Sequence, residues 1–60
     1  MSTERLAIRH ADGTWHTWDC EWSSNLDDAH RYLPRESHKA NAVIEQLRAK
    51  GTPCEIVRLP

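Results

Sequence analysis

The chain has little of what marks several large protein classes. It contains only two glycines, Gly13 and Gly51, so a glycine-rich loop that cradles phosphate is excluded. No apolar run exceeds three residues, whereas a membrane-spanning helix needs roughly 18 to 20. Two cysteines, Cys20 and Cys54, are too few for a disulfide scaffold, and residues 1–5 lack the apolar segment of a secretion signal. These absences predict a soluble cytoplasmic protein with free thiols and no membrane partner.

Size and charge narrow the choice further. The 60 residues are expected to form one domain, residues 1–60, with 38% hydrophobic content and a net charge of −1. A chain this short buries only about 60% of the surface that its unfolded form exposes. We therefore expect a small core without room for a large enclosed substrate pocket, which disfavours an enzyme.

Residues 4–19 predict a β-hairpin around the loop Ala11-Asp12-Gly13. A two-residue loop, Asp12-Gly13, would place apolar residues of the first strand opposite polar ones. A three-residue loop with Gly13 in the left-handed conformation gives one apolar face instead. Because a shift of one residue reverses every side chain, the pattern favours the three-residue loop.

This register determines which side chains are expected in the core. It places Leu6 opposite Trp18 and Arg9 opposite Trp15. Trp18 then faces inward, whereas Trp15 faces solvent beside Arg9. The expected core face consists of Leu6, Ile8, Trp18, Cys20 and Trp22.

Two helices are expected next, over residues 25–33 and 35–50. Ser23-Ser24-Asn25 offers an N-cap, and helical spacing continues to Leu33. Pro34 then starts the second helix or kinks a single long one, and both alternatives remain open. The second helix has the clearest apolar stripe and ends at Gly51. The stripes are Leu26, Ala29 and Leu33 in the first helix, and Ala40, Val43, Ile44 and Leu47 in the second.

The last segment, residues 54–59, predicts a third strand that is apolar on both faces. We expect it beside the first strand and antiparallel to it. The predicted fold is α+β in the order ββααβ, a three-stranded antiparallel sheet of order 2-1-3 with the helices on one face.

Four histidines and two cysteines suggest metal binding or thiol chemistry by number alone. No Cys-x-x-Cys or His-x-x-x-His motif occurs, and ligands of one zinc ion must lie within about 4 Å of each other. A catalytic thiol needs a neighbouring base, whereas Cys20 and Cys54 are expected in strands. We therefore expect no metal, no cofactor and no catalytic residue.

Three tryptophans in so short a chain favour a protein interface, because Trp and Arg are enriched at the centres of interfaces. Trp15, exposed beside the hairpin tip, is the expected anchor. The candidate partner-binding residues are Arg9, Asp12, Trp15, His16 and Thr17.

The alternative partner is nucleic acid. Residues 30–39 carry a local charge of +2, whereas residues 19–28 carry −4. The basic segment could contact phosphates, although nucleic-acid-binding proteins usually have a positive overall charge. The candidate residues are Arg31, Arg35, His38 and Lys39.

Together these features predict a small non-enzymatic binding protein that modulates or inhibits a larger protein complex. A homodimer is compatible with this prediction. The size is typical of accessory regulators encoded by phages and mobile elements, and a DNA- or RNA-binding regulator is the alternative.

Overall fold

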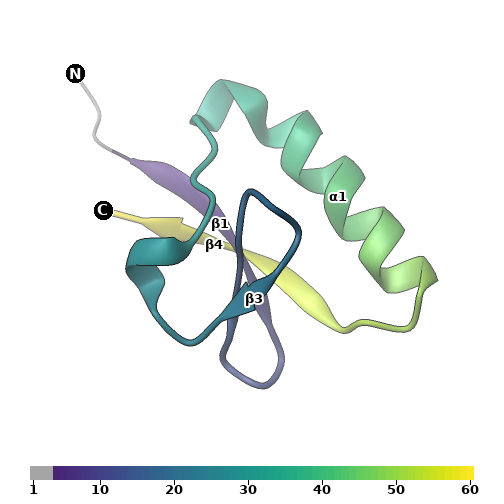
Figure 1. Ribbon diagram of the computed structural model, residues 1–60. Helices are drawn as coiled ribbons and strands as arrows, with labels where there is room; N and C mark the ends of the chain where they lie inside the picture. Colours follow the sequence, from purple (N-terminus) through teal and green to yellow (C-terminus); the bar gives the residue numbers. More distant parts are fainter. Residues whose placement is uncertain (1–3) are drawn as a thin grey trace.

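The computed structural model describes residues 4–60 and shows an α+β fold with a four-stranded antiparallel sheet and one α-helix (Figure 1). Within these residues no helix is long and apolar enough to cross a bilayer. In the sheet the strands follow the order β3-β2-β1-β4. The elements are β1 (Arg5–His10), β2 (Trp15–His16), β3 (Trp22–Ser23), the 3-10 turns η1 (Leu26–Asp28) and η2 (Pro34–Glu36), α1 (Ser37–Ala49) and β4 (Cys54–Leu59).

Strand β1 lies inside the sheet, as the sequence predicts. Along its whole length it pairs antiparallel with β4, with Ile8 opposite Ile56. The expected neighbours of the first strand are therefore confirmed, but a further strand, β3, extends the sheet beyond the predicted order 2-1-3.

The hairpin between β1 and β2 has the predicted three-residue loop. Arg9 lies opposite Trp15, and the His10 N–H donates to the Thr14 carbonyl at 2.8 Å. Gly13 closes the loop with φ at 94°, a backbone conformation that L side chains rarely adopt.

A second hairpin of the same kind follows at once and was not predicted. The Thr17 N–H donates to the Glu21 carbonyl at 2.9 Å, and the Cys20 N–H donates to the Thr17 carbonyl at 3.1 Å. Cys20 has φ at 65° and occupies the place that Gly13 holds in the first hairpin. The predicted second strand is therefore interrupted by a turn, which separates β2 from β3.

This turn overturns the expected positions of Trp18 and Cys20. Leu6 pairs with Tyr32 rather than with Trp18, through backbone hydrogen bonds of 2.8 and 2.7 Å. Tyr32 is buried, whereas Trp18 is 79% exposed and Cys20 is exposed. The prediction that Trp18 and Cys20 belong to the core is wrong because the chain leaves β1 directly after His16.

The predicted helix over 25–33 is also wrong. Only the short turn η1 forms there, capped by the Asn25 side chain, which accepts from the Asp27 N–H at 3.0 Å. Ala29 after the turn is extended, with ψ at 135°, and the chain continues towards Tyr32. The segment around Tyr32 therefore forms backbone hydrogen bonds with β1 in place of further helical ones. Leu26, expected on the apolar stripe of this helix, is 37% exposed.

Helix formation resumes at Pro34, which opens η2 and leads into α1. This agrees with a separate helix rather than with one kinked helix. Gly51 ends it with φ at 86°. The core lies between α1 and one face of the sheet. Its buried members are Leu6, Ile8, Tyr32, Ala40, Ile44 and Cys54, and Trp22, Val43, Leu47 and Ile56 pack against them.

Replacing Cys20 by Gly is expected to raise the free energy of unfolding by about 0.5 to 1 kcal/mol. A left-handed φ costs an L residue roughly 1 to 2 kcal/mol, which the greater freedom of unfolded glycine offsets in part. Gly13→Ala, the matched change in the first hairpin, should lower stability by about 1 kcal/mol. Urea unfolding measures both variants, and a destabilised Cys20→Gly protein would contradict the strained turn.

Candidate functional site

The structure brings together two of the five residues predicted to bind a partner. Arg9 and Trp15 are cross-strand neighbours, and the Arg9 guanidinium lies 5.9 Å from the centre of the Trp15 ring. By strand alternation they lie on the sheet face opposite Ile8, which faces α1. Trp15 is half-buried rather than exposed as expected.

The side chains of His16 and Thr17 are buried, so neither forms a surface beside Trp15. The Thr17 hydroxyl donates to the Asp19 carboxylate and accepts from the Glu21 N–H at 3.0 Å. Thr17 therefore holds the second hairpin turn in shape and offers no contact surface. His16 packs edge-on against Trp22, with ring centres 5.1 Å apart.

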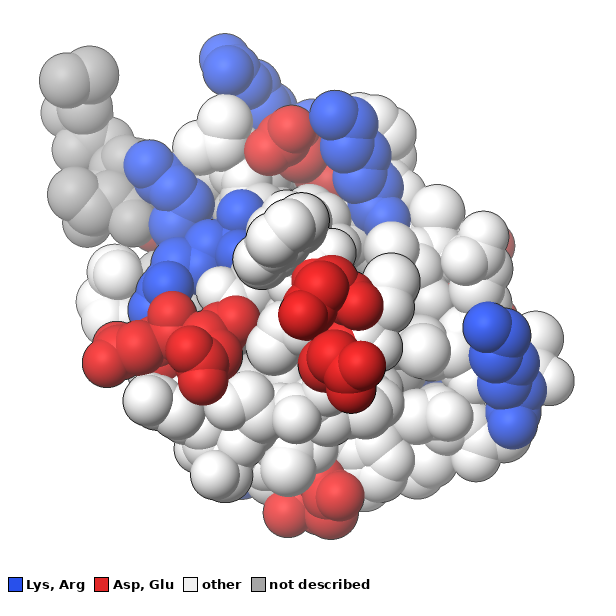
Figure 2. Space-filling view, viewed as in Figure 1, with Lys and Arg blue, Asp and Glu red and all other residues white. Residues whose placement is uncertain are grey.

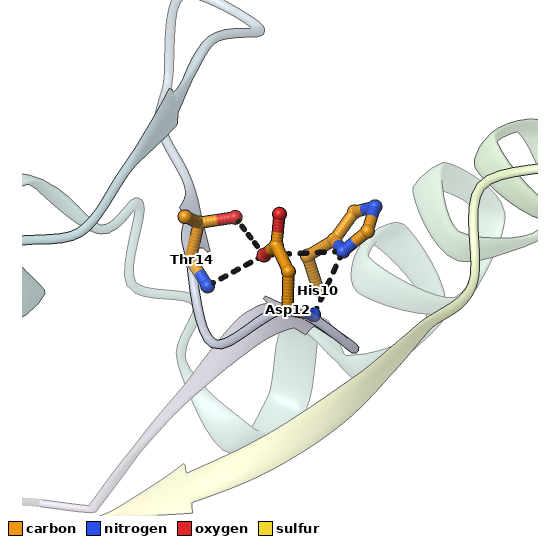
Figure 3. Close-up of polar contacts among 3 residues, drawn as sticks. All are labelled: His10, Asp12 and Thr14. Atoms are coloured by element: carbon orange, nitrogen blue, oxygen red, sulfur yellow. Dashed lines mark hydrogen bonds and ion pairs between the residues drawn. The ribbon is translucent and has the colours of Figure 1, made fainter.

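Asp12, the remaining predicted contact, is exposed but already bonded within its own loop (Figure 3). Its carboxylate accepts from the Thr14 N–H at 2.9 Å and from the Thr14 hydroxyl at 2.6 Å. These bonds lower the pKa of Asp12, the hydroxyl contributing most. The Asp12 N–H in turn donates to Nδ1 of His10 at 3.0 Å. Asp12 thus stabilises the loop that presents its neighbours.

The four basic residues predicted to bind nucleic acid are all exposed. Lys39 forms an ion pair with Glu36 at 3.2 Å, the local pairing that their spacing suggests. Arg31 donates to the Leu26 carbonyl at 3.3 Å. Arg35 lines a shallow hollow together with Arg5. Two of these four residues, Arg31 and Lys39, are thus engaged within the protein.

The most exposed large hydrophobic side chain in the described part of the chain is Trp18. It is the first residue of the turn Trp18-Asp19-Cys20, and we call residues 17–21 the Trp18 loop. The cross-turn hydrogen bonds and the Thr17 hydroxyl fix this loop at both ends. An indole is thus presented to solvent by backbone that is already ordered.

Carboxylates gather around the Trp18 loop. Figure 2 shows Asp and Glu side chains near the centre of the view and others at its left, where Lys or Arg side chains lie directly beside them. A groove of about 290 Å³ here is lined by Trp18, Trp22 and three carboxylates. The carboxylates are those of Asp19, Glu21 and Asp28.

On its other side, Trp18 lines a second hollow of about 280 Å³ between the Trp18 loop and α1. Tyr32, Val43 and Leu47 give this hollow apolar walls. His16 also lines it, only 5% exposed, and its enclosed Nδ1 has no hydrogen-bond partner. Burial lowers the pKa of His16 and so favours the neutral imidazole.

Cys20 and His30 border the same hollow as His16. Within residues 4–60, however, no group of three or more His, Cys, Asp or Glu side chains is placed to hold a metal ion. The second thiol, Cys54, is buried in the core, and burial raises its pKa. The thiol that can meet a solute is therefore that of Cys20.

Sequence reasoning missed Trp18 as a surface residue because strand alternation was extended through it. The signal for a turn was weak, since neither Gly nor Pro marks it. A Thr two residues before Asp19 was the available clue, because hydroxyl and carboxylate side chains at such spacing often bond within a turn.

Comparison with protein-family models finds none that matches this chain. No curated protein and no solved structure matches it either.

Acidification from pH 7 to pH 5 is expected to lower the free energy of unfolding through His16. An unfolded histidine takes up a proton near pH 6.5, whereas the buried His16 resists it, so protons favour the unfolded state. His16→Gln should flatten this pH dependence, and His38→Gln, on the exposed face of α1, should not. Chemical unfolding at several pH values measures how the free energy of unfolding changes with pH. The same change with pH in both variants would contradict the assignment of this effect to His16.

The native protein should react quickly with one equivalent of a thiol reagent, at Cys20, because that thiol is exposed. Cys54 should react only when the protein unfolds. A time course with 5,5′-dithiobis(2-nitrobenzoate) measures this. Cys20→Ser should remove the fast phase, and a fast phase that survives this substitution would place Cys54 at the surface.

Proposed function

We propose that this protein is a small non-enzymatic binding protein that contacts a larger partner protein through the Trp18 loop. The observation that supports this proposal most directly is the 79% exposure of Trp18. Tryptophan is the residue most enriched at the energetic centres of interfaces, where its large ring is removed from water. Exposure leaves most of that apolar surface available for burial against a partner.

The order of the loop supports the same proposal. Binding by a mobile loop loses affinity because the loop must be immobilised on contact. In the Trp18 loop, the hydrogen bonds between Thr17 and Glu21 fix the backbone before any partner arrives. The left-handed Cys20 is a strained residue of the kind that is found at functional sites more often than elsewhere.

The proposal keeps the predicted class of function and moves the contact site. Trp15 was expected to be the anchor, but it is half-buried against Arg9 and offers less surface than Trp18. An inhibitory role, a cytoplasmic location and a phage-type origin stay predictions from size and composition, as does a homodimer.

Nucleic-acid binding through residues 30–39 stays the alternative prediction. Phosphates would have to approach Arg31, Arg35, His38 and Lys39 on a protein whose Trp18 face carries carboxylates. Such binding would weaken steeply as salt rises, because phosphate contacts release counterions.

Trp18→Ala is expected to weaken partner binding by about 2 kcal/mol or more, roughly 30-fold, while the melting temperature changes little. Tagged wild-type and variant proteins, incubated with source-cell lysate, can be compared by quantitative mass spectrometry of the retained proteins. A specific partner should be retained by the wild type and lost from Trp18→Ala. Asn41→Ala, a change at an exposed site on α1 outside both candidate sites, is the control and should retain it.

Two results would count against the proposal. A partner that is lost from Trp15→Ala but retained by Trp18→Ala would show that the contact site is at Trp15, on the sheet face that points away from α1. Retained nucleic acid that disappears at moderate salt and on Arg35→Ala would favour the alternative.

A further inference from the structure

The side chain of Trp18 stands between the two hollows described above. We call the groove beside Asp19, Glu21 and Asp28 the acidic hollow, and the one beside Tyr32 and Leu47 the apolar hollow. The indole lines both, so a segment that crosses Trp18 would reach both at once.

The acidic hollow is suited to a cation. None of its lining residues is Lys or Arg, and among residues 4–60 no Lys or Arg forms an ion pair with its carboxylates. Asp28 accepts from the Ser23 hydroxyl at 2.8 Å, a neutral donor that leaves the charge uncompensated. Trp18 and Trp22 add aromatic surface, and the faces of such rings attract Lys and Arg side chains.

The apolar hollow is suited to an aromatic ring. Its volume of about 280 Å³ exceeds the roughly 150 Å³ of a cavity that holds benzene. His30, Gln46 and Lys50 also line it and carry polar side chains. A hydroxyl group on the bound ring can form hydrogen bonds with these side chains, which favours tyrosine over phenylalanine.

Lys50 orients the segment, because it lines the apolar hollow and lies outside the acidic one. Its ammonium group repels a second cation. A Lys or Arg side chain that arrives at Trp18 is therefore directed to the side of Glu21 and Asp28.

We propose that the partner segment carries a Lys or Arg next to a Tyr and straddles Trp18, with the cation in the acidic hollow and the tyrosine ring in the apolar hollow. This proposal rests on the protein-binding function proposed above and specifies its partner. The shapes and charges of the two hollows support it independently of each other.

The probes are three capped peptides: acetyl-Gly-Arg-Tyr-Gly-amide and its counterparts with Glu in place of Arg or Ala in place of Tyr. Titration of the labelled full-length protein, followed by two-dimensional NMR, gives the affinity and location of each. The Arg-Tyr peptide should bind at least about tenfold more tightly than either counterpart, as expected when one ionic or one buried aromatic contact is lost. Its largest shifts should fall at Glu21 and Asp28 and at Tyr32 and Leu47.

A charge reversal tests the acidic hollow separately. Glu21→Lys should weaken binding of the Arg-Tyr peptide about tenfold or more and strengthen binding of the Glu-Tyr peptide. Glu55→Lys is the matched control, since Glu55 is an exposed carboxylate on β4 away from Trp18, and it should change neither affinity. Equal losses in both variants would show a general charge effect and overturn the acidic-hollow assignment.

A separate variant tests whether the tyrosine ring binds in the apolar hollow. Val43→Phe narrows the apolar hollow from its α1 side, so it should remove the advantage of Tyr over Ala in the peptide. An unchanged preference for Tyr would overturn the placement of the ring.

Failure of this proposal can be told from failure of the proposed function. If Trp18→Ala loses the cellular partner while the Arg-Tyr peptide binds no better than its counterparts, the partner chemistry is wrong and the docking loop stands. If Trp18→Ala keeps the partner, both are wrong.

Discussion

The paired backbone hydrogen bonds between Leu6 and Tyr32 determine the arrangement of the rest of the molecule. Strand β1 pairs with β4 along one edge, and its other edge is shared between β2 near the hairpin and Tyr32 further back. Because Tyr32 takes the place beside Leu6, the chain after His16 must turn away from β1. The second hairpin, the burial of Tyr32 and the exposure of Trp18 all follow from this competition for one strand edge.

The burial of Tyr32 offsets the strain at Cys20 in this arrangement. Tyr32 brings a large apolar ring into the core, where it joins Leu6 and Ile44, whereas Cys20 adopts a left-handed conformation that costs a non-glycine residue roughly 1 to 2 kcal/mol. Burying an aromatic side chain contributes about 1.5 to 3 kcal/mol, and this exchange of backbone strain for burial offsets the cost at Cys20. The same exchange leaves Trp18 at the surface between a hollow of carboxylates and a hollow of apolar walls.

Much of the fold could be predicted from local chemistry. Gly13 and Gly51 end elements with a positive φ that few other residues adopt, and Pro34 opens a helical turn, where its missing N–H costs nothing. Strand alternation correctly placed Leu6 and Ile8 in the core, because alternate side chains of a strand point to the same face of the sheet. The choice between Trp18 and Tyr32 as the neighbour of Leu6 could not be made in this way. It depends on a contact between residues far apart in the sequence, and Trp18 and Tyr32 are both aromatic, with nothing local to distinguish them. The exposure of Trp18 is a consequence of that choice, so local chemistry could not predict this part of the candidate site, and a tryptophan contact with a partner stays a prediction.

A nuclear Overhauser measurement on the native protein tests this account most directly. The account predicts cross-peaks between the backbone protons of Leu6 and Tyr32, the pattern of an antiparallel strand pair, and none between Leu6 and the Trp18 ring. Strong cross-peaks from the Trp18 ring to Leu6, with none from Tyr32, would contradict it. The second strand would then continue past His16, and Trp18 would belong to the core.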